Sequence, residues 1–203
     1  MTRKHVLRPT QLALLDPETI PFPSKTLVLF GPTSELHPLV LQSLFLRAQR
    51  DERLGLIVGD NHLNEYALTR LARAHGFNPA ALLARIDFSR PFTCHQLHHC
   101  IVDLVPEKAT RWRALYILGL LDTFYDEDIR LPIVLRLISD LLIRLRLIAS
   151  QGLPVLITLA PPPSETTRAG LIARVIHAAD AYWQPSPEVL EHAERTVQQI
   201  GFW

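Results

Sequence analysis

The sequence has few of the features that mark specialised classes of protein. It contains only two cysteines in 203 residues, Cys94 and Cys100, which are too few for a disulfide framework and fit a reducing compartment. No apolar run is long enough and free enough of charge to span a bilayer. The N-terminus lacks the apolar segment and small-residue cleavage site of a secretory signal. We therefore expect a cytoplasmic protein without a membrane segment.

An excess of charge of one sign is also missing. The chain carries 21 basic and 20 acidic side chains, for a formal net charge of +1, so it lacks the overall positive charge typical of nucleic-acid-binding domains. Hydrophobic residues make up 48% of the chain and charged residues 20%, as in globular proteins. Residues 1–24 contain four prolines and one short apolar cluster. We interpret them as an N-terminal arm, and residues 25–203 as a single core domain.

Short apolar runs alternate with segments of helical periodicity along the core. Five runs indicate buried strands, at residues 26–30, 54–58, 86–89, 114–120 and 154–159. The segments between them indicate helices, at residues 40–50, 65–75, 79–85, 95–104 and 132–150. Residues 168–183 and 187–203 add helices or strands that the pattern does not distinguish. Strands that alternate with helices predict an α/β fold with a mainly parallel sheet flanked by helices.

The first strand is followed by a segment that invites comparison with the phosphate-binding loop G-x-x-x-x-G-K-[ST]. Gly31 matches the first glycine, but Leu36, His37 and Pro38 stand at the positions of the second glycine, the lysine and the hydroxyl residue. Pro38 lacks an amide donor, and Glu35 adds a negative charge that repels phosphate. A glycine after a strand is also common in ordinary turns between a strand and a helix. The segment alone therefore fits either a remnant phosphate loop or such a turn.

The segment from residue 76 to residue 96 resembles the RecA/RadA recombinase family. The family has glycine, Asn or Asp with proline, an apolar helix, isoleucine, an Arg-x-Phe step and a final His-Gln at the corresponding positions. Flanking similarity extends the resemblance over about residues 25–160 and includes Leu63, Leu68, Ala72, residues 118–125, Leu141, Leu142, Ile157 and Thr158. The matching residues of the central segment are Gly76, Asn78, Pro79, Leu82, Leu83, Ile86, Arg90, Phe92, His95 and Gln96.

This resemblance implies a three-layer RecA-like P-loop NTPase fold in which several catalytic positions are altered. The strand aspartate of the magnesium site falls at Gly119, and the Asn-Gln pair that senses nucleotide falls at Leu159 and Ala160. The water-activating glutamate falls at Asp60, a shorter carboxylate. Phosphoryl transfer depends on charge neutralisation, so a remnant Asp60 without lysine and metal ligand would not catalyse it.

Three functional hypotheses follow. The leading one is a catalytically degenerate, non-hydrolysing accessory or scaffold subunit in DNA recombination or repair, with no cofactor and with a protein partner or a copy of itself bound. Its remnant phosphate loop would comprise Gly31, Thr33, Ser34 and His37. The second is a divergent ATPase that binds ATP and magnesium with His37, Asp60 and Asp122. The third is a DNA-binding module that works without nucleotide.

Residues 94–100, around the start of the helix expected at residues 95–104, contain a cluster of potential zinc ligands. These are Cys94, His95, His98, His99 and Cys100, of which His95 and His99 share a helix face. A site built from one helix needs ligands from elsewhere, and the resemblance already accounts for His95, so we favour a partly buried helix that carries histidines over a zinc site. The helix at residues 132–150 is apolar almost all round, which fits either burial under the sheet or cover by a partner subunit.

The resemblance places two DNA-contacting loops after the later strands. The first begins at Asp126, Glu127 and Asp128, whose charge repels phosphate. The second covers residues 160–174, with Arg168 and Arg174 as its only cations. Two arginines make a weak prediction of a nucleic-acid contact. Trp183 and Trp203 fit either buried aromatics or exposed anchors for a partner.

Overall fold

The computed structural model describes residues 26–60 and 62–184, apart from the side chain of Glu65. The proposed arm and residues 187–203 lie outside this part of the chain. The described strands are β1 Thr26–Phe30, β2 Leu54–Val58, β3 Ile86–Ser89, β4 Ala114–Leu118, β5 Val155–Leu159 and β6 Ala181–Trp183. They form one sheet in the order β3-β2-β4-β5-β1-β6, and every pairing in it is parallel.

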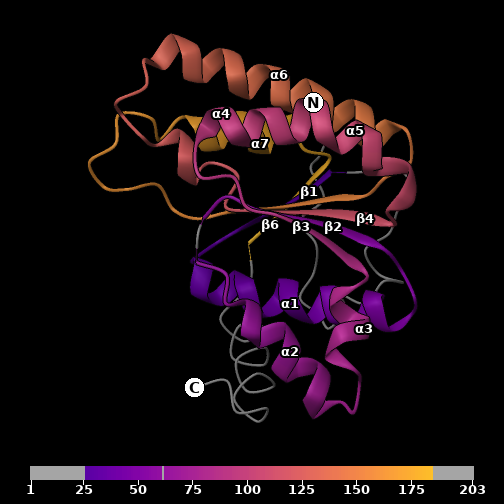
Figure 1. The fold of residues 1–203 in the computed structure, drawn as a ribbon. Coiled ribbons are helices and arrows are strands. Elements are labelled where there is room, and N and C mark those ends of the chain that lie inside the picture. Colours follow the sequence, from indigo (N-terminus) through magenta and orange to yellow (C-terminus); the bar gives the residue numbers. More distant parts are fainter. Residues whose placement is uncertain (1–25, 61, 185–203) are drawn as a thin grey trace.

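Helices cover both faces of this sheet (Figure 1). On one face lie α1 Thr33–Gln49, α2 Glu65–Ala74 and α3 Pro79–Leu83. The other face carries α4 Cys94–His99, the π-helix η2 Cys100–Leu104, α5 Val105–Lys108, α6 Leu131–Ser150 and α7 Leu171–Ala178. Two short 3₁₀ turns, η3 Ala109–Arg111 and η4 Asp122–Phe124, flank β4. The molecule is thus a three-layer α/β structure.

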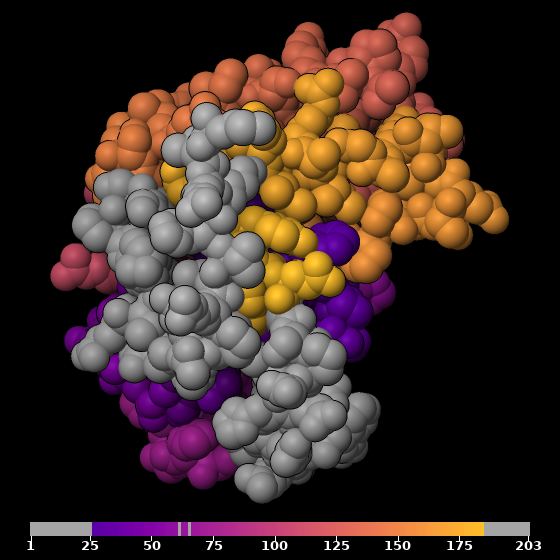
Figure 2. Space-filling view, turned by 180° about the vertical axis from the view of Figure 1, so that it is seen from behind, coloured from indigo at the N-terminus to yellow at the C-terminus, as the bar shows by residue number. Residues whose placement is uncertain are grey.

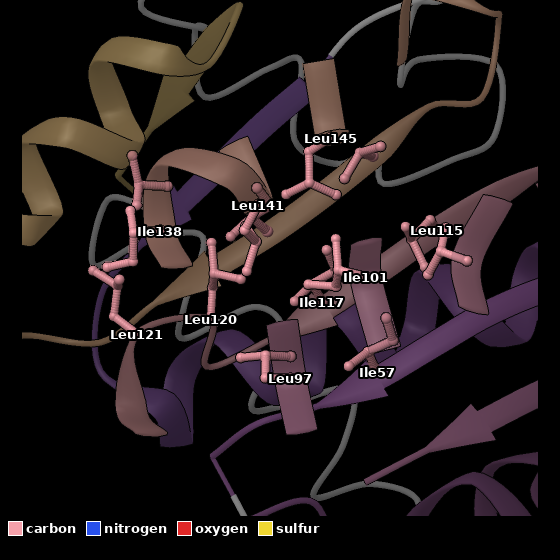
Figure 3. Close-up of a cluster of buried hydrophobic side chains, with 14 of the residues drawn as sticks. Ile57, Leu97, Ile101, Leu115, Ile117, Leu120, Leu121, Ile138, Leu141 and Leu145 are labelled. Carbon is pink, nitrogen blue, oxygen red and sulfur yellow. The ribbon is translucent and has the colours of Figure 1, made fainter. Parts of the chain in front are cut away.

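The two helical layers rest on two separate apolar clusters. Successive strand side chains point to opposite faces. In β4, Tyr116 and Leu118 pack with α1 and α2, whereas Leu115 and Ile117 pack with α4, η2 and α6. Figure 3 shows the second cluster, in which aliphatic side chains of the sheet and of the covering helices point toward one another. Strands buried on both faces explain the continuous apolar runs of the sequence.

Strands from distant parts of the sequence are neighbours at one end of the sheet. β1 lies between β5 and β6, so an N-terminal strand is enclosed by the last two strands of the described chain. From behind, indigo residues near the start accordingly lie beside yellow residues near the end (Figure 2). Trp183 in β6 is only 3% exposed, which confirms the buried alternative for this side chain. No helix among the described residues is long and apolar enough to cross a membrane.

Candidate functional site at the carboxyl edge of the sheet

All strands of a parallel sheet end at the same edge, and in open α/β folds ligands bind in crevices beyond that edge. Here the strand ends are followed by Gly31 after β1, by Gly59 and Asp60 after β2, by Gly119 after β4, and by Ala160 after β5. The sequence-predicted residues Gly31, Asp60 and Gly119 are therefore brought to one edge. Their contacts determine what this edge can bind.

The connection between β1 and α1 is much shorter than the sequence indicated. Pro32 precedes the helix, and its carbonyl accepts from the backbone N–H groups of Glu35 and Leu36, at 3.0 and 3.1 Å. The helix therefore begins at Thr33, and the prediction of a loop up to Pro38 with a helix from residue 40 is wrong. Proline disfavours a helix interior, but Pro38 lies in the second turn of this helix, where the side chains around it are buried.

The remnant-loop residues are consequently placed in the helix rather than around an open loop. Thr33 and Ser34 form its first turn, while Leu36 is fully buried. Gly31 stays at the strand end, where its N–H donates to the carbonyl of Leu159 at 3.1 Å. Only Gly31 and Pro32 remain between strand and helix.

His37 points from α1 to the end of β2. Its Nε2 lies 2.7 Å from Oδ2 of Asp60, and both side chains are buried. The backbone N–H of His62 donates to the other carboxylate oxygen of Asp60, Oδ1, at 3.1 Å. Burial alone would raise the pKa of Asp60, but the hydrogen bond and charge of His37, aided by His62, lower it below its ordinary value. Both oxygens of Asp60 thus have partners within the chain.

Gly119, at the end of β4, packs directly against Asp60. Its φ is +59°, and a Cβ added there would lie 2.3 Å from Cβ of Asp60. A residue with a side chain is therefore excluded both by the left-handed backbone and by contact with Asp60. The N–H of Gly119 donates to Oγ1 of Thr158 at 3.0 Å, which ties the end of β4 to β5.

Beyond Gly119, the 3₁₀ turn η4 carries further polar groups. Burial and the nearby charge of Asp60 raise the pKa of Asp122. Burial and Asp122 together raise the pKa of Tyr125 to about 12. The Oγ1 of Thr123 and the hydroxyl of Tyr125 are buried without a hydrogen-bond partner in the structure. Sequence reasoning missed His62, Thr123 and Tyr125, and the only available signal was their position shortly after a strand end.

The two loops that the resemblance assigned to DNA are joined to each other. Arg168 is 5% exposed, and its guanidinium donates to backbone carbonyls of the loop after β4. The N–H of Thr167 also donates to the Glu127 carboxylate at 3.1 Å; this bond and the Thr166 hydroxyl lower the pKa of Glu127. Arg168 is therefore engaged inside the protein, whereas Arg174 is exposed on α7. The carbonyls that accept from Arg168 are those of Phe124, Asp126, Glu127 and Ile129.

The side chains of the cysteine and histidine cluster do not point toward a common centre. Cys94 and Cys100 are buried in the apolar layer beneath α4, and burial raises the pKa of both thiols. His99 instead faces outward and pairs with Asp103 at 2.8 Å, and His95 is exposed. Within the described part of the chain, no group of three or more His, Cys, Asp or Glu residues could hold a metal ion. The zinc alternative has no support in this geometry.

The comparisons with known proteins agree with this architecture. No protein-family model matches the chain, and no curated protein matches it. Among solved structures, a crystal structure of the RadB recombinase superposes with a TM-score of 0.64. The match covers 81% of this chain and 76% of that chain, at 17% sequence identity. A likeness at this identity concerns the fold, and it confirms the prediction of a three-layer RecA-like α/β fold.

Proposed function

We propose that this chain is a RecA-like protein that does not hydrolyse ATP. It acts by binding a protein partner or further copies of itself, as an accessory or scaffold subunit in DNA recombination or repair. The fold shared with a recombinase supports the link to recombination. Fold alone does not fix activity, so the chemistry is argued from the site.

The bond between His37 and Asp60 is the observation that carries this proposal. The resemblance aligns His37 with the lysine that neutralises phosphate and Asp60 with the carboxylate that activates water. Here the two side chains are 2.7 Å apart, buried and bonded to each other. A nucleotide would have to separate them and leave a buried carboxylate without its partner, which costs several kcal/mol. The side chains at two positions that phosphoryl transfer uses are thus engaged with each other within the protein.

The backbone around this pair supports the same conclusion. A phosphate loop wraps several consecutive amides around the phosphates before its helix begins. Only Gly31 and Pro32 separate β1 from α1, and Pro32 has no amide N–H. At the end of β4, the contact of Gly119 with Asp60 leaves no room for a metal-binding carboxylate at that position.

The surface loops favour a protein partner over DNA. Arg168, one of two candidate cations, is buried and donates to carbonyl oxygens. The same loop junction presents Asp126, Glu127 and Asp128, whose charges repel a phosphate backbone. A nucleotide-independent DNA-binding module therefore receives no support from these two loops.

Phosphate release and binding of a fluorescent ATP analogue with magnesium test the proposal on the full chain. We expect release no faster than in buffer and no saturable binding in the micromolar range. Turnover above background that Asp60→Ala abolishes would overturn the proposal in favour of the ATPase that uses His37, Asp60 and Asp122. Asp128→Ala, a change of an exposed carboxylate outside the site, is the matched control.

A measurement of single-stranded DNA binding addresses the remaining hypothesis. Affinity that falls steeply with salt concentration would favour the DNA-binding module over the accessory subunit. We expect no such salt-dependent binding. If it occurs, Arg174→Ala compared with Arg168→Ala would show whether the exposed arginine makes the contact.

A further inference from the structure

The helix α6 carries apolar side chains on the face that points away from the sheet. Its inner side chains belong to the second apolar cluster, and they include Leu141 and Leu145. Ile143 lies two residues from each of these, which is about 200° around a helix of 3.6 residues per turn, so it points outward. Ile143 is 69% exposed, and Leu147, one turn further along, is 46% exposed. The outer face of α6 thus has an apolar centre.

Neighbouring helices flank this face without covering it. Asp140 and Arg146, three residues before and after Ile143, lie about 60° to either side of it. Oδ2 of Asp140 is 3.7 Å from Nε2 of His98 in α4, and Arg146 donates to the carbonyl of Ala178 in α7 at 3.4 Å. Figure 1 shows α6 at the outer boundary of its helical layer. A second molecule can therefore approach the row of side chains through Ile143.

The composition of this face favours a protein partner. An apolar centre with a polar rim is the usual pattern of a protein interface. A nucleic acid is a poorer match, because Ile143 and Leu147 stand between the arginines of α6 and Asp140 repels phosphate. The exposed polar residues of the rim are Arg136, Ser139, Asp140, Arg146 and Ser150.

A second copy of α6 complements this face when the two helices run antiparallel. A two-fold axis perpendicular to the helix at Ile143 places the two Ile143 side chains opposite each other. In this isologous arrangement, each side of one helix adjoins the same side of the other. Asp140 and Arg144 are four residues apart and lie on one side of the helix. Each Asp140 therefore comes beside Arg144 of the other copy, so the charges of the face match those of its own copy.

We propose that two copies of the chain form a dimer through the outer faces of α6, antiparallel and centred on Ile143. Each copy uses the same face, so the contact closes on itself and gives a dimer rather than a longer assembly. It also explains why α6 is apolar on the side away from the sheet. The inference rests on the partner-binding part of the proposed function and names the partner. It is independent of the bonds at the carboxyl edge.

Sedimentation of the full chain over a range of concentrations tests this inference. We expect the wild type to pass from monomer to dimer, and Ile143→Glu to associate at least about tenfold more weakly. Ile143 is mostly exposed, so thermal melting of the monomeric variant should match that of the wild-type monomer. Tyr66→Glu is the matched control. Tyr66 is 78% exposed in an apolar groove of the other helical layer, lined by α2, α3, β2 and β3, and this variant should dimerise like the wild type.

Charge reversal tests the antiparallel pairing. Asp140→Arg and Arg144→Asp each bring like charges together at both junctions of the dimer, so each variant alone should associate several-fold more weakly than the wild type. In an equimolar mixture the introduced charges meet charges of opposite sign. The mixture should therefore recover association, as dimers that contain one chain of each variant.

Cross-linking tests the register. Ile143→Cys should form a disulfide-linked dimer under mild oxidation, because the two copies of this residue meet at the axis. Arg136→Cys is the control, since it lies seven residues from the axis and its two copies would be about 21 Å apart along the helices. The native Cys94 and Cys100 are buried and should not contribute.

Three results would overturn the inference: a wild type that stays monomeric at every concentration, association that Ile143→Glu leaves unchanged, and cross-linking of Arg136→Cys as readily as of Ile143→Cys. ATP turnover would contradict the proposed function and leave the dimer unaffected. Loss of the dimer would leave the absence of hydrolysis unaffected, so the two proposals fail separately.

Discussion

The carboxyl edge of the sheet differs from the apolar groove lined by α2, α3, β2 and β3 in whether its side chains have partners within the chain. At the edge, the polar groups that resemble a nucleotide site are bonded to one another, as in His37 with Asp60 and Gly119 with Thr158. In the groove, large apolar side chains such as Tyr66 and Leu83 are exposed to solvent. The region that carries a recognisable motif is closed by the chain itself, and the region without a motif is open. The exposed side chains of the groove are therefore more available to another molecule than the bonded groups of the edge.

Of the changes that test this comparison, Gly119→Ala should have the largest effect on stability. It places a side chain against Asp60 at the carboxyl edge. We expect the free energy of unfolding to fall by about 3 kcal/mol or more, from left-handed strain and from contact with Asp60. Urea denaturation measures the loss. Gly76→Ala is the control, since its φ of +66° is similar but no atom lies within 4 Å of its added Cβ. Equal losses in both variants would show that the edge is not tightly closed.

Arg168→Met should be the next most severe change. It leaves several carbonyls of the loop after β4 without their donor, and we expect a loss of about 2–3 kcal/mol in the free energy of unfolding. Arg168→Lys should recover little, because an ammonium lacks the planar set of donors that serves several carbonyls. Arg174→Met, at an exposed position, should stay within about 0.5 kcal/mol of the wild type. A similar small effect at Arg168 would contradict the structural role.

Asp60→Asn should lower the free energy of unfolding at neutral pH by about 1–2 kcal/mol. It should also change the pH dependence. The pKa of Asp60 is lower in the folded state, so its contribution is complete above the unfolded value of about 3.9 and is lost as pH falls through the folded value. Stability should therefore decline less steeply on acidification in the variant than in the wild type, as measured by urea denaturation at successive pH values.

Asp122 provides a control of opposite sign for that experiment. Its pKa is raised in the folded state, so the folded protein binds the proton more readily and Asp122 favours folding below its unfolded pKa. That contribution is lost as pH rises through the folded pKa. Asp122→Asn should consequently make the decline of stability in acid steeper. Identical acid profiles for the two variants would argue against a charge-coupled cluster at this edge.

Tyr66→Ala should have the smallest effect on stability. With 78% of its surface exposed, its removal should change the free energy of unfolding by no more than about 0.5 kcal/mol. A much larger loss in thermal or urea unfolding would mean that the groove is part of the core. That result would remove the contrast between the two regions.

The strands were predictable because short, continuous apolar runs bounded by turn residues can hardly form anything else in an alternating α/β chain. The runs at residues 26–30, 54–58 and 86–89 coincide with β1, β2 and β3. The start of α1 was not predictable, since Pro38 is a break by local rules and is accommodated only by tertiary packing.

The candidate site was predictable only in its position. The resemblance brought Asp60 and Gly119 to the strand ends, but the bond between His37 and Asp60 joins residues 23 positions apart, and no spacing rule reveals it. Arg168 was taken for a surface cation because its carbonyl partners lie about 40 residues away in the sequence. The groove was invisible because exposed and buried apolar residues look alike in a sequence.

The position of β1 in the sheet has a consequence for synthesis on the ribosome. Among the described strands, β1 pairs with β5 and β6, whose residues emerge more than a hundred positions later, whereas β2 pairs with the nearer strands β3 and β4. The nascent chain can therefore assemble β2, β3 and β4 first, while the apolar strand β1 stays unpaired until β5 and β6 have been synthesised. Chaperones bind exposed apolar strands of this kind. Premature termination before β5 would release a chain in which β1 has no strand to pair with.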